Sequence, residues 1–242
     1  MWRQEALARA RRGDLCPACL GLAWVRAGNF ALGHPRFGTL EPCPVCTKGR
    51  LPEYLRQASG LSGWMVDARF GGYLQTDARR AQYQAAQRIA ERGHGWLTLW
   101  GAYGQSKTFL LSAIVNHAIE HKRPAVYVTA SRLLDHLRDA YKPGGLGFSE
   151  AFHHWADCQV LAIDEADAYH DTSWAQDKYR QLLDHRYNLA VSGESITLFA
   201  CNPEPGGDGW PEALDWLHDR MRHFEIVQTQ GGSLRPILRE ER

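Results

Sequence analysis

GAYGQSKT, at residues 101–108, follows directly on the apolar run WLTLW. A phosphate-binding loop between a strand and a helix has the pattern G-x-x-x-x-G-K-[ST], and this stretch supplies Gly101, Lys107 and Thr108. Ser106 stands where the pattern has its last glycine. Because backbone amides in such a loop bind an anion, we expect a nucleotide here. The residues expected to bind it are Gly101, Tyr103, Gly104, Gln105, Ser106, Lys107 and Thr108.

The sequence around this loop alternates short apolar runs with amphipathic stretches. Short apolar strands that alternate with helices indicate a parallel sheet covered on both faces, with ligands outside the carboxyl ends of the strands. The predicted fold class is therefore α/β, with a parallel five-stranded sheet between helices. The predicted strands are WLTLW (96–100), AVYVT (125–129), QVLAI (159–163), SITLFA (195–200) and FEIVQ (224–228), with helices at 77–92, 109–122 and 131–141.

Polar side chains stand at the carboxyl ends of two further strands. Asp164 and Glu165 follow the third strand, and Asn202 follows the fourth. Lys107 is expected to reach the β- and γ-phosphates, while Thr108 and Asp164 hold Mg²⁺. Glu165 is expected to orient or deprotonate the attacking water, and Asn202 to complete its position. The alternatives are an exposed lysine at a helix start, a solvated acidic turn and an Asn-Pro turn.

Ser106 is the one departure from the loop pattern. A phosphate-binding loop often needs glycine because the backbone takes a positive φ, and serine there costs about 1 kcal/mol or more. We expect nucleotide binding to survive and hydrolysis to be slow.

Four of the six cysteines form two close pairs, Cys16-x2-Cys19 and Cys43-x2-Cys46. Two such pairs complete a tetrahedral shell of four thiolates, which suits a structural zinc ion. In a reducing compartment the pattern favours a metal over disulfides. The alternatives are chance pairs or a redox site, and His34 is interpreted as a loop residue. A segment this short has too little core to fold unaided, so Zn²⁺ is expected to contribute folding energy.

The composition limits the classes of function. The chain has 242 residues, 44% of them hydrophobic, and a formal net charge of +1. This charge gives no overall attraction to nucleic acid or anionic lipid, so any DNA contact has to be local. No apolar run suits a membrane span or a signal peptide, and we expect a cytoplasmic protein with no membrane partner.

Four motifs, GAYGQSKT, VLAIDEAD, LFACNP and LDWLHDRM, occur in this order along the chain. They resemble the P-loop, acidic strand, sensor asparagine and arginine motif of AAA+ ATPases of the DnaC/IstB type. That family comprises bacterial and phage replicative-helicase loaders and the helper ATPases of some transposases. The resemblance covers about residues 75–240 and implies an ATPase that uses ATP and Mg²⁺ and lacks a lid domain. The implied domains are a zinc ribbon at 1–50, a linker at 51–74 and an AAA+ ATPase domain at 75–242.

The same resemblance implies partners and further site residues. Arg220, in HDRM, corresponds to an arginine finger that reaches a neighbour's nucleotide in an ATP-dependent homo-oligomer. Arg235, in SLRP, corresponds to an arginine near the nucleotide of its own subunit. A surface arginine is the alternative for each. Single-stranded DNA is expected near AYKPGGLGF, where Tyr141, Lys142 and Phe148 could track phosphates and stack bases, unless this stretch is a plain loop.

The leading interpretation is an ATP-dependent loader whose zinc ribbon docks on a replicative helicase and which helps to place that helicase on single-stranded DNA. One alternative is a nucleotide-dependent transposition helper that polymerises on duplex DNA. The other is an adaptor that has lost hydrolysis through Ser106 and recruits its partner through the ribbon.

Overall fold

The chain consists of two compact units in a computed structural model, Met1–Gln57 and Ala58–Arg242. The division lies inside the expected linker, residues 51–74, so most of that segment belongs to the larger unit. The structure describes residue 19 and residues 24–26, 39–43, 51–140, 148–168 and 172–233.

In the smaller unit, two short strands form an antiparallel pair. β1 (Trp24–Arg26) lies beside β2 (Leu40–Pro42). Helix α2 (Leu51–Ala58) begins in this unit and ends at the division.

Two of the four paired cysteines are described in this unit. Cys19 and Cys43 are buried in one cluster, against which Val25 packs. Cys16 and Cys46 lie outside the described residues, so the expected four-cysteine site stays a prediction.

A parallel sheet forms the centre of the larger unit, with the spatial order β4-β5-β6-β3-β7. The expected α/β fold is therefore confirmed, and each strand lies within one residue of the apolar run that predicts it. β3, β5 and β6 are buried along nearly their whole length because helices cover both faces of the sheet. The strands are β3 (Gly95–Trp100), β4 (Ala125–Thr129), β5 (Val160–Asp164), β6 (Ile196–Cys201) and β7 (Glu225–Gln228).

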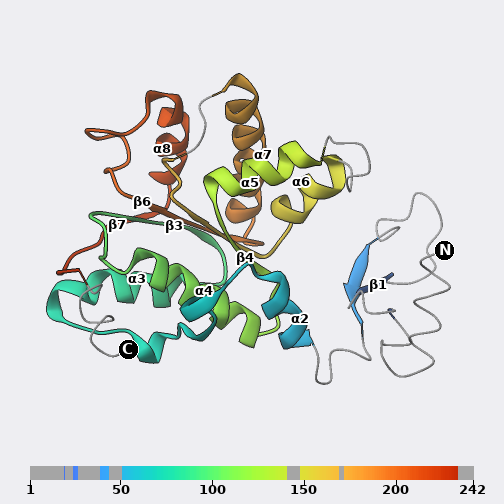
Figure 1. Cartoon of the computed structure of the whole chain (residues 1–242), viewed down its shortest axis with the longest axis horizontal. Helices are drawn as coiled ribbons and strands as arrows, with labels where there is room; N and C mark the ends of the chain where they lie inside the picture. Colours follow the sequence, from blue (N-terminus) through green and yellow to red (C-terminus); the bar gives the residue numbers. More distant parts are fainter. Residues whose placement is uncertain are drawn as a thin grey trace. The chain divides into compact units, whose positions relative to one another are not determined.

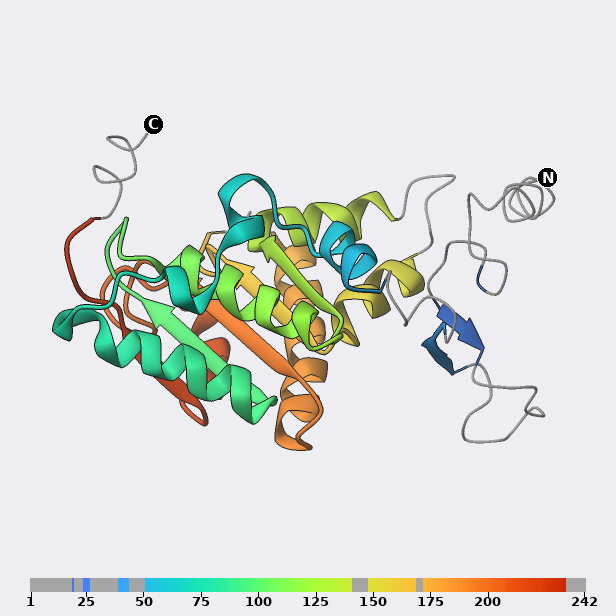
Figure 2. The same ribbon diagram turned by 90° about the horizontal axis from the view of Figure 1, so that it is seen from below.

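The helices form one layer on each face of this sheet (Figures 1 and 2). α3 (Arg80–Arg92) and α4 (Lys107–Glu120) cover one face. The other face is covered by α5 (Ala130–Asp139), α6 (Phe148–Ala156), α7 (Ser173–Val191) and α8 (Asp215–Met221). Because β5, β6 and β3 are neighbours, the loops that follow them meet at one edge of the sheet.

The segment between α2 and α3 forms short 3-10 turns, of which the first two pack against α4: η1 (Gly63–Asp67), η2 (Phe70–Gly72) and η3 (Asp77–Arg79). Asn116 of α4 donates its side-chain amide to the carbonyl oxygens of Met65 at 2.8 Å and Ala68 at 2.9 Å. Ser59 accepts a hydrogen bond of 2.7 Å from the backbone N–H of Tyr127, on the outer edge of β4. Gly60 follows at φ 74°, where a Cβ atom would collide with the Tyr127 carbonyl oxygen.

Arg186 of α7 is a fully buried charge within the core. Its guanidinium donates to the side-chain oxygen of Thr197 at 2.9 Å and to four backbone carbonyl oxygens. These carbonyls belong to Trp155 and Ala156 at the end of α6, to Cys158 before β5 and to Ile196 of β6. Burial lowers the pKa of Arg186 below its usual range. The side chain thus joins a helix end to the starts of two strands.

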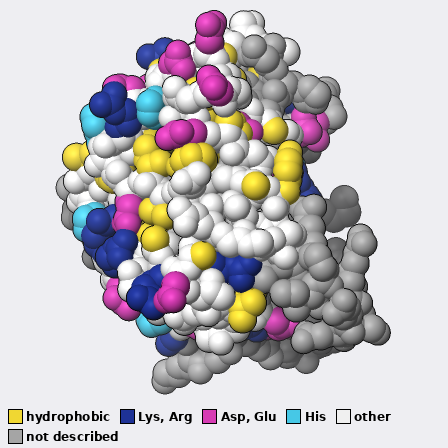
Figure 3. All heavy atoms as spheres, turned by 90° about the vertical axis from the view of Figure 1, so that its left-hand side faces the viewer, with side chains coloured by type: hydrophobic (Ala, Val, Ile, Leu, Met, Phe, Trp, Pro, Cys, Tyr) yellow, Lys and Arg dark blue, Asp and Glu magenta, His cyan; other side chains and the backbone are white. Residues whose placement is uncertain are grey.

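The surface at the β7 edge is mixed in charge. Viewed from the side of β7 and α3, lysine and arginine side chains stand among aspartate and glutamate (Figure 3). One such pair, Arg88 of α3 with Glu225 of β7, ties the edge strand to its covering helix. Among the residues described, no helix combines the length and the apolar composition that crossing a membrane requires.

Candidate nucleotide-binding site

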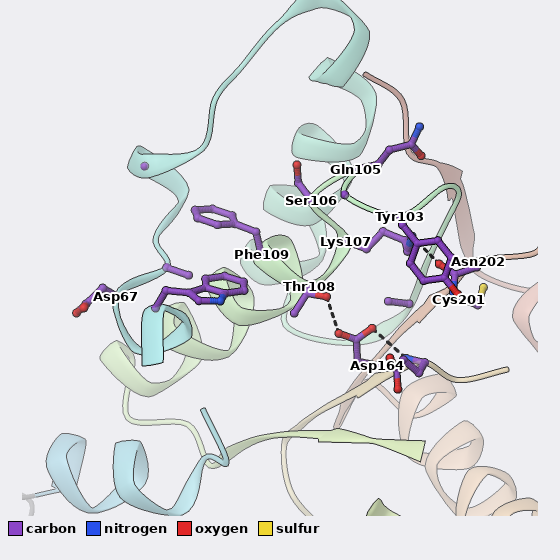
Figure 4. A pocket seen from close by; sticks show the side chains of 16 residues that line it. Asp67, Tyr103, Gln105, Ser106, Lys107, Thr108, Phe109, Asp164, Cys201 and Asn202 are labelled. Atoms are coloured by element: carbon purple, nitrogen blue, oxygen red, sulfur yellow. Dashed lines mark hydrogen bonds between the residues drawn. The ribbon is translucent and has the colours of Figure 1, made fainter. Parts of the chain in front are cut away.

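The loop after β3 borders a cavity of about 410 Å³ at the carboxyl edge of the sheet (Figure 4). The volume lies in the range of small-molecule sites. Three kinds of segment line it: the loop and first turn of α4, the ends of β5 and β6, and the 3-10 segment before α3. The lining residues are Trp64, Asp67, Ala68, Gly72, Tyr103, Gly104, Gln105, Ser106, Lys107, Thr108, Phe109, Asp164, Glu165, Ala200, Cys201 and Asn202.

The backbone of the loop has positive φ at three of its positions. Gly101 has φ 141°, and a Cβ atom there would lie 2.5 Å from the side-chain oxygens of both Gln105 and Thr229. Gly104 has φ 81° and abuts Ser233. Both positions therefore require glycine. The pattern predicts this for Gly101, whereas Gly104 stands at one of its variable positions. Ser106 has φ 70°, so the serine occupies the left-handed conformation that favours glycine.

Lys107 begins α4 and directs its ammonium group into the mouth of the loop. Nζ donates to the carbonyl oxygens of Gly101 at 2.5 Å and Ala102 at 3.0 Å, and to Oδ1 of Asn202 at 3.2 Å. Its side chain is 9% exposed, which does not fit an ordinary solvated lysine. A positive charge at a helix N-terminus is unfavourable by itself, so a bound anion would relieve this arrangement.

Asp164 ends β5 and is fixed by three donors. Oδ2 accepts hydrogen bonds from the Thr108 hydroxyl at 2.6 Å and the Tyr127 hydroxyl at 2.7 Å, and Oδ1 accepts one from the Glu165 N–H at 2.9 Å. Burial, and next the Asp164 charge, raise the pKa of Tyr127 well above its usual range, so the phenol stays a donor. Thr108 and Asp164, the two expected Mg²⁺ residues, are thus in direct contact.

The described residues fit magnesium better than a metal held by protein alone. They contain no group of three or more His, Cys, Asp or Glu side chains that could hold an ion. Mg²⁺ at nucleotide sites is bound through one or two protein groups, with water and phosphate oxygens completing its shell. The hydroxyl of Thr108 and the carboxylate of Asp164 supply this limited donor set.

Glu165 lines the cavity and has a strained backbone conformation at φ 50°. Three non-glycine residues in the described part of the chain have positive φ: Ser106, Lys122 and Glu165. Two of them line this cavity. Strain of this kind costs of order 1–3 kcal/mol and gathers at functional sites. The conformation supports a special role for Glu165, because an ordinary solvated turn could avoid it.

Asp167 is a residue of the acidic run that the sequence interpretation missed. Burial raises the pKa of its carboxyl above the usual range, while backbone hydrogen bonds, including one with Asn202, and the charge of Lys107 act in the opposite direction. It therefore belongs to the polar group around Lys107 and Asn202. The signal was present, because Asp167 lies in the same IDEAD run as Asp164.

One wall of the cavity is aromatic and comes from outside the nucleotide motifs. Trp64 is 50% exposed, and its ring is nearly parallel to that of Phe109, with 6.2 Å between the centroids and 7° between the planes. The ring of Tyr73 also packs against that of Phe109, with 5.7 Å between the two centroids. Trp64 lies in the expected linker, where an isolated aromatic residue among Gly and Ser has no periodicity to reveal its place.

Gln82 of α3 ties the loop to distant parts of the chain. Its amide nitrogen donates to the Tyr73 hydroxyl at 2.7 Å and to the Gln105 carbonyl at 3.2 Å. Its amide oxygen accepts from the N–H of Gln230 at 2.7 Å. Thr229 adds a hydrogen bond of 2.9 Å to the Gln105 side chain. The segment after β7 is therefore held against the phosphate loop.

Arg220 does not reach the cavity of its own subunit. It lies on α8, where Nε and Nη2 contact Oδ1 of Asp184 at 2.8 and 2.7 Å. Its guanidinium also stands 5.0 Å from the ring centre of Tyr187. The role of Arg220 at a neighbouring site therefore stays a prediction.

The other expected residues are only partly within the described chain. Arg235, Tyr141 and Lys142 lie outside it. Phe148 is the first residue of α6, and its ring packs against Phe152 and under the ammonium group of Lys178. One face of the Phe148 ring is thus covered by a lysine.

Replacing Ser106 by glycine is expected to stabilise the protein by about 0.5–1 kcal/mol. The change relieves the cost of a Cβ atom at φ 70°, which exceeds the added freedom of the unfolded chain. The Ser106 side chain points away from Lys107 and Asp164 (Figure 4), so its influence on hydrolysis is confined to the backbone. ATP turnover should then rise by at most about fivefold, the equivalent of roughly 1 kcal/mol.

Urea unfolding and ATPase assays of Ser106→Gly would measure both quantities. Lys122→Gly is the matched control, because Lys122 has φ 60° at the far end of α4. It should gain similar stability without changing turnover. If Ser106→Gly were no more stable than the wild type, the backbone at Ser106 would not be strained. A hundredfold rise in turnover would show that the Ser106 hydroxyl blocks the reaction directly.

Comparison with known proteins agrees with this geometry. The sequence profile of the bacterial DnaA ATPase domain matches residues 66–226. The chain is 23% identical over 146 residues to the chromosomal replication initiator protein DnaA of Chromobacterium violaceum, covering 60% of this chain and 29% of that protein. It is 27% identical over 175 residues to the replicative helicase loader DnaI of Bacillus subtilis, covering 67% of this chain and 54% of that protein.

A solved structure shows the same fold. The AMPPCP-bound DnaA of Aquifex aeolicus superposes with a TM-score of 0.60 at 19% identity, covering 72% of this chain and 54% of that one. The chain thus spans only part of each of these relatives. The family profile, however, covers residues 66–226, which include the loop after β3 and the ends of β5 and β6 that meet at the cavity. By this match, and with the AAA+ fold of DnaA- and DnaC-like proteins, the chain belongs to the family of the bacterial DnaA ATPase domain.

Proposed function

We propose that this chain binds ATP with Mg²⁺ and hydrolyses it slowly, as an AAA+ protein of DNA replication that helps to load a replicative helicase. The observation that carries the proposal is the arrangement across the cavity of Lys107 with Asn202 on one side and Thr108 with Asp164 on the other. A structural loop would have no reason to bring these four side chains, from three separate motifs, around one cavity.

The residues divide the chemistry between them. Backbone N–H groups of residues 103–107 and the start of α4 would bind the phosphates. Lys107 would exchange its carbonyl acceptors for β- and γ-phosphate oxygens. Mg²⁺, held through Thr108 and Asp164, would neutralise charge that develops on the phosphates. Glu165 would accept the proton of the attacking water, and Asn202 would keep that water in line.

The base of the nucleotide is expected against the aromatic wall. Trp64 and Phe109 line the cavity, and the half-exposed indole offers a flat apolar surface. Stacking of a base on an aromatic side chain contributes about 1–3 kcal/mol. This wall gives a role to a segment outside the nucleotide motifs.

A replicative helicase is the proposed partner, with the unit that contains the paired cysteines as its docking element. Two findings support it: the family assignment and the sequence similarity to DnaI, which is named a replicative helicase loader. We also propose an ATP-dependent homo-oligomer with Arg220 and Arg235 near nucleotide, and single-stranded DNA near residues 141–148.

Zn²⁺ is proposed as the structural ion of the smaller unit, bound by Cys16, Cys19, Cys43 and Cys46. The burial of Cys19 and Cys43 in one cluster supports it. Metal analysis of the purified full chain should give one equivalent of zinc, and Cys43→Ser should lose it. A Cys43→Ser protein that keeps a full equivalent would contradict the site.

The test of the proposed function is ATP binding by the full chain with and without Lys107. Isothermal titration calorimetry in Mg²⁺ should show binding by the wild type and a loss of about 10–100-fold in affinity for Lys107→Ala, because a charged hydrogen bond contributes about 1.5–3 kcal/mol. Lys122→Ala removes a lysine two residues beyond the other end of the same helix and should bind normally. If the wild type shows no binding at millimolar ATP, the enzyme is excluded and the adaptor function remains.

A further inference from the structure

The carboxylate of Asp164 is held by donors from three elements. Thr108 of α4 and Tyr127 of β4 both donate to Oδ2, while the N–H of Glu165 donates to Oδ1. Each carboxylate oxygen has about two lone-pair positions, so the two hydroxyls fill those of Oδ2. The orientation of the carboxylate is therefore fixed before any ligand binds.

Tyr127 differs from Thr108 in what it can touch. Thr108 lines the cavity, whereas Tyr127 is not among the residues that line it. β4 pairs in parallel with β5, with Tyr127 opposite Ala162 and Thr129 opposite Asp164. Tyr127 thus lies two residues before the end of its strand, and its long side chain reaches Asp164 from outside the cavity. Any influence of Tyr127 on a bound ligand has to pass through Asp164.

The backbone of Tyr127 is also fixed. Its N–H donates to the carbonyl oxygen of Ser59 at 2.7 Å. Gly60 lies so close to the Tyr127 carbonyl oxygen that a Cβ atom on Gly60 would be only 2.4 Å from it. The phenol is therefore presented from a strand that is bonded on both sides, to β5 and to the segment after α2.

We propose that Tyr127 is a positioning residue for magnesium, which holds the Asp164 carboxylate in the orientation that binds the metal and its water. This inference rests on the proposed function. Thr108 would have to share its oxygen between Asp164 and a bound Mg²⁺, whereas Tyr127, which does not line the cavity, would keep its hydrogen bond to Asp164. Partners of metal ligands that act in this way typically change metal affinity by about 10–100-fold when they are removed.

The variant Tyr127→Phe removes only the hydroxyl oxygen. The ATP dissociation constant of the full chain is measured by calorimetry in Mg²⁺ and in EDTA. In EDTA, we expect Tyr127→Phe to bind ATP with the wild-type affinity. The increase in ATP affinity on adding Mg²⁺ should be about tenfold smaller than in the wild type. The Mg²⁺ concentration for half-maximal hydrolysis should rise in parallel.

Tyr179→Phe is the matched control. Tyr179 is a fully buried tyrosine of α7 whose hydroxyl lies 3.5 Å from the Ala166 carbonyl oxygen. Removing the Tyr179 hydroxyl makes the same chemical change without a contact to Asp164. The increase in ATP affinity on adding Mg²⁺ should therefore equal that of the wild type. Melting temperatures of both variants report any general loss of packing.

A double-mutant cycle shows whether the effect passes through Asp164. In an Asp164→Asn background, Tyr127→Phe should cause no further loss of Mg²⁺ dependence. The inference would be overturned if Tyr127→Phe lost the same ATP affinity in EDTA as in Mg²⁺, or if Mg²⁺ raised its ATP affinity as much as in the wild type. Neither outcome would contradict ATP binding by the wild type. A wild type that binds ATP without any gain from Mg²⁺ would also overturn the inference, and one that binds no ATP would overturn the proposed function as well.

Discussion

Arg220→Ala is expected to leave ATP affinity near the wild-type value and to lower hydrolysis by up to about 10³-fold, the lower end of the range for arginine fingers. The arginine lies outside the cavity of its own subunit, paired with Asp184 and stacked on Tyr187. Because Arg220 is not among the residues that line the cavity of its own chain, we propose that it acts on the γ-phosphate from a neighbouring subunit. ATP-induced assembly, followed by light scattering, should weaken together with hydrolysis.

The ion pair with Asp184 makes a single substitution ambiguous, since losing it could also disturb α8. Mixing removes the ambiguity. Arg220→Ala and Glu165→Gln each lack a different half of a shared site, so a mixed assembly contains intact sites. At equal proportions about one interface in four joins a complete acidic site to a complete arginine in a head-to-tail ring. Mixed samples should regain a matching part of the wild-type rate.

Arg222→Ala is the control for this experiment. Arg222 is an exposed arginine two residues beyond Arg220, and its loss removes the same charge from the same helix end. Hydrolysis should stay near the wild-type rate. No recovery in mixtures that demonstrably assemble together, or an Arg220→Ala protein as active as the wild type, would exclude the shared site.

Arg186→Met is expected to destabilise the larger unit by about 3–5 kcal/mol. Replacing a buried ion pair by apolar residues can be neutral, because both charges leave together. The partners of Arg186 are instead four backbone carbonyls, the Thr197 hydroxyl and the Cys158 sulfur, which stay in place when the guanidinium is removed. Each buried acceptor left without a donor costs about 1–3 kcal/mol. The melting temperature should fall by roughly 10 °C or more.

Two further substitutions on α7 and the same unfolding measurement separate charge from geometry. Arg186→Lys keeps the charge but loses the planar set of donors, so its stability should lie between those of the wild type and Arg186→Met. Arg180→Met removes an exposed arginine from the same helix and should change stability by less than about 1 kcal/mol. If Arg186→Met unfolds at the wild-type temperature, the carbonyls find other donors and the proposed role is wrong.

The parts of the fold that could be predicted are those with a strong local signal. Each strand of the sheet is a short, continuous apolar run, and such a run is typical of a strand that is buried on both faces. The phosphate loop is predictable because its chemistry fixes residue types at fixed spacing. Asp164 and Asn202 are predictable because each follows an apolar run, and the two strands concerned prove to be neighbours. Even the unusual backbone at Ser106 is foreseeable, since the pattern calls for glycine there.

The remaining site residues have no local signal. Gln82 looks like a polar residue on an amphipathic helix until the segments around Tyr73 and Gln230 are brought against it. Trp64 lies in a stretch that resembles a linker, and Tyr127 looks like one more residue of a buried strand. Their roles depend on which distant elements become neighbours. Neither α6 nor α7 is among the helices expected from the sequence, because tertiary contacts such as those of Arg186 support them.

The hydrogen bond between Ser59 and Tyr127 also has a consequence for aggregation. β4 is an outer strand of the sheet, and an open row of backbone donors and acceptors is a template for pairing with another chain. The segment after α2 covers part of that row, and Gly60 lets it approach the strand closely. A shortened protein that begins beyond Gly60 would expose this edge, so it should associate edge to edge even though every residue of the nucleotide cavity is retained.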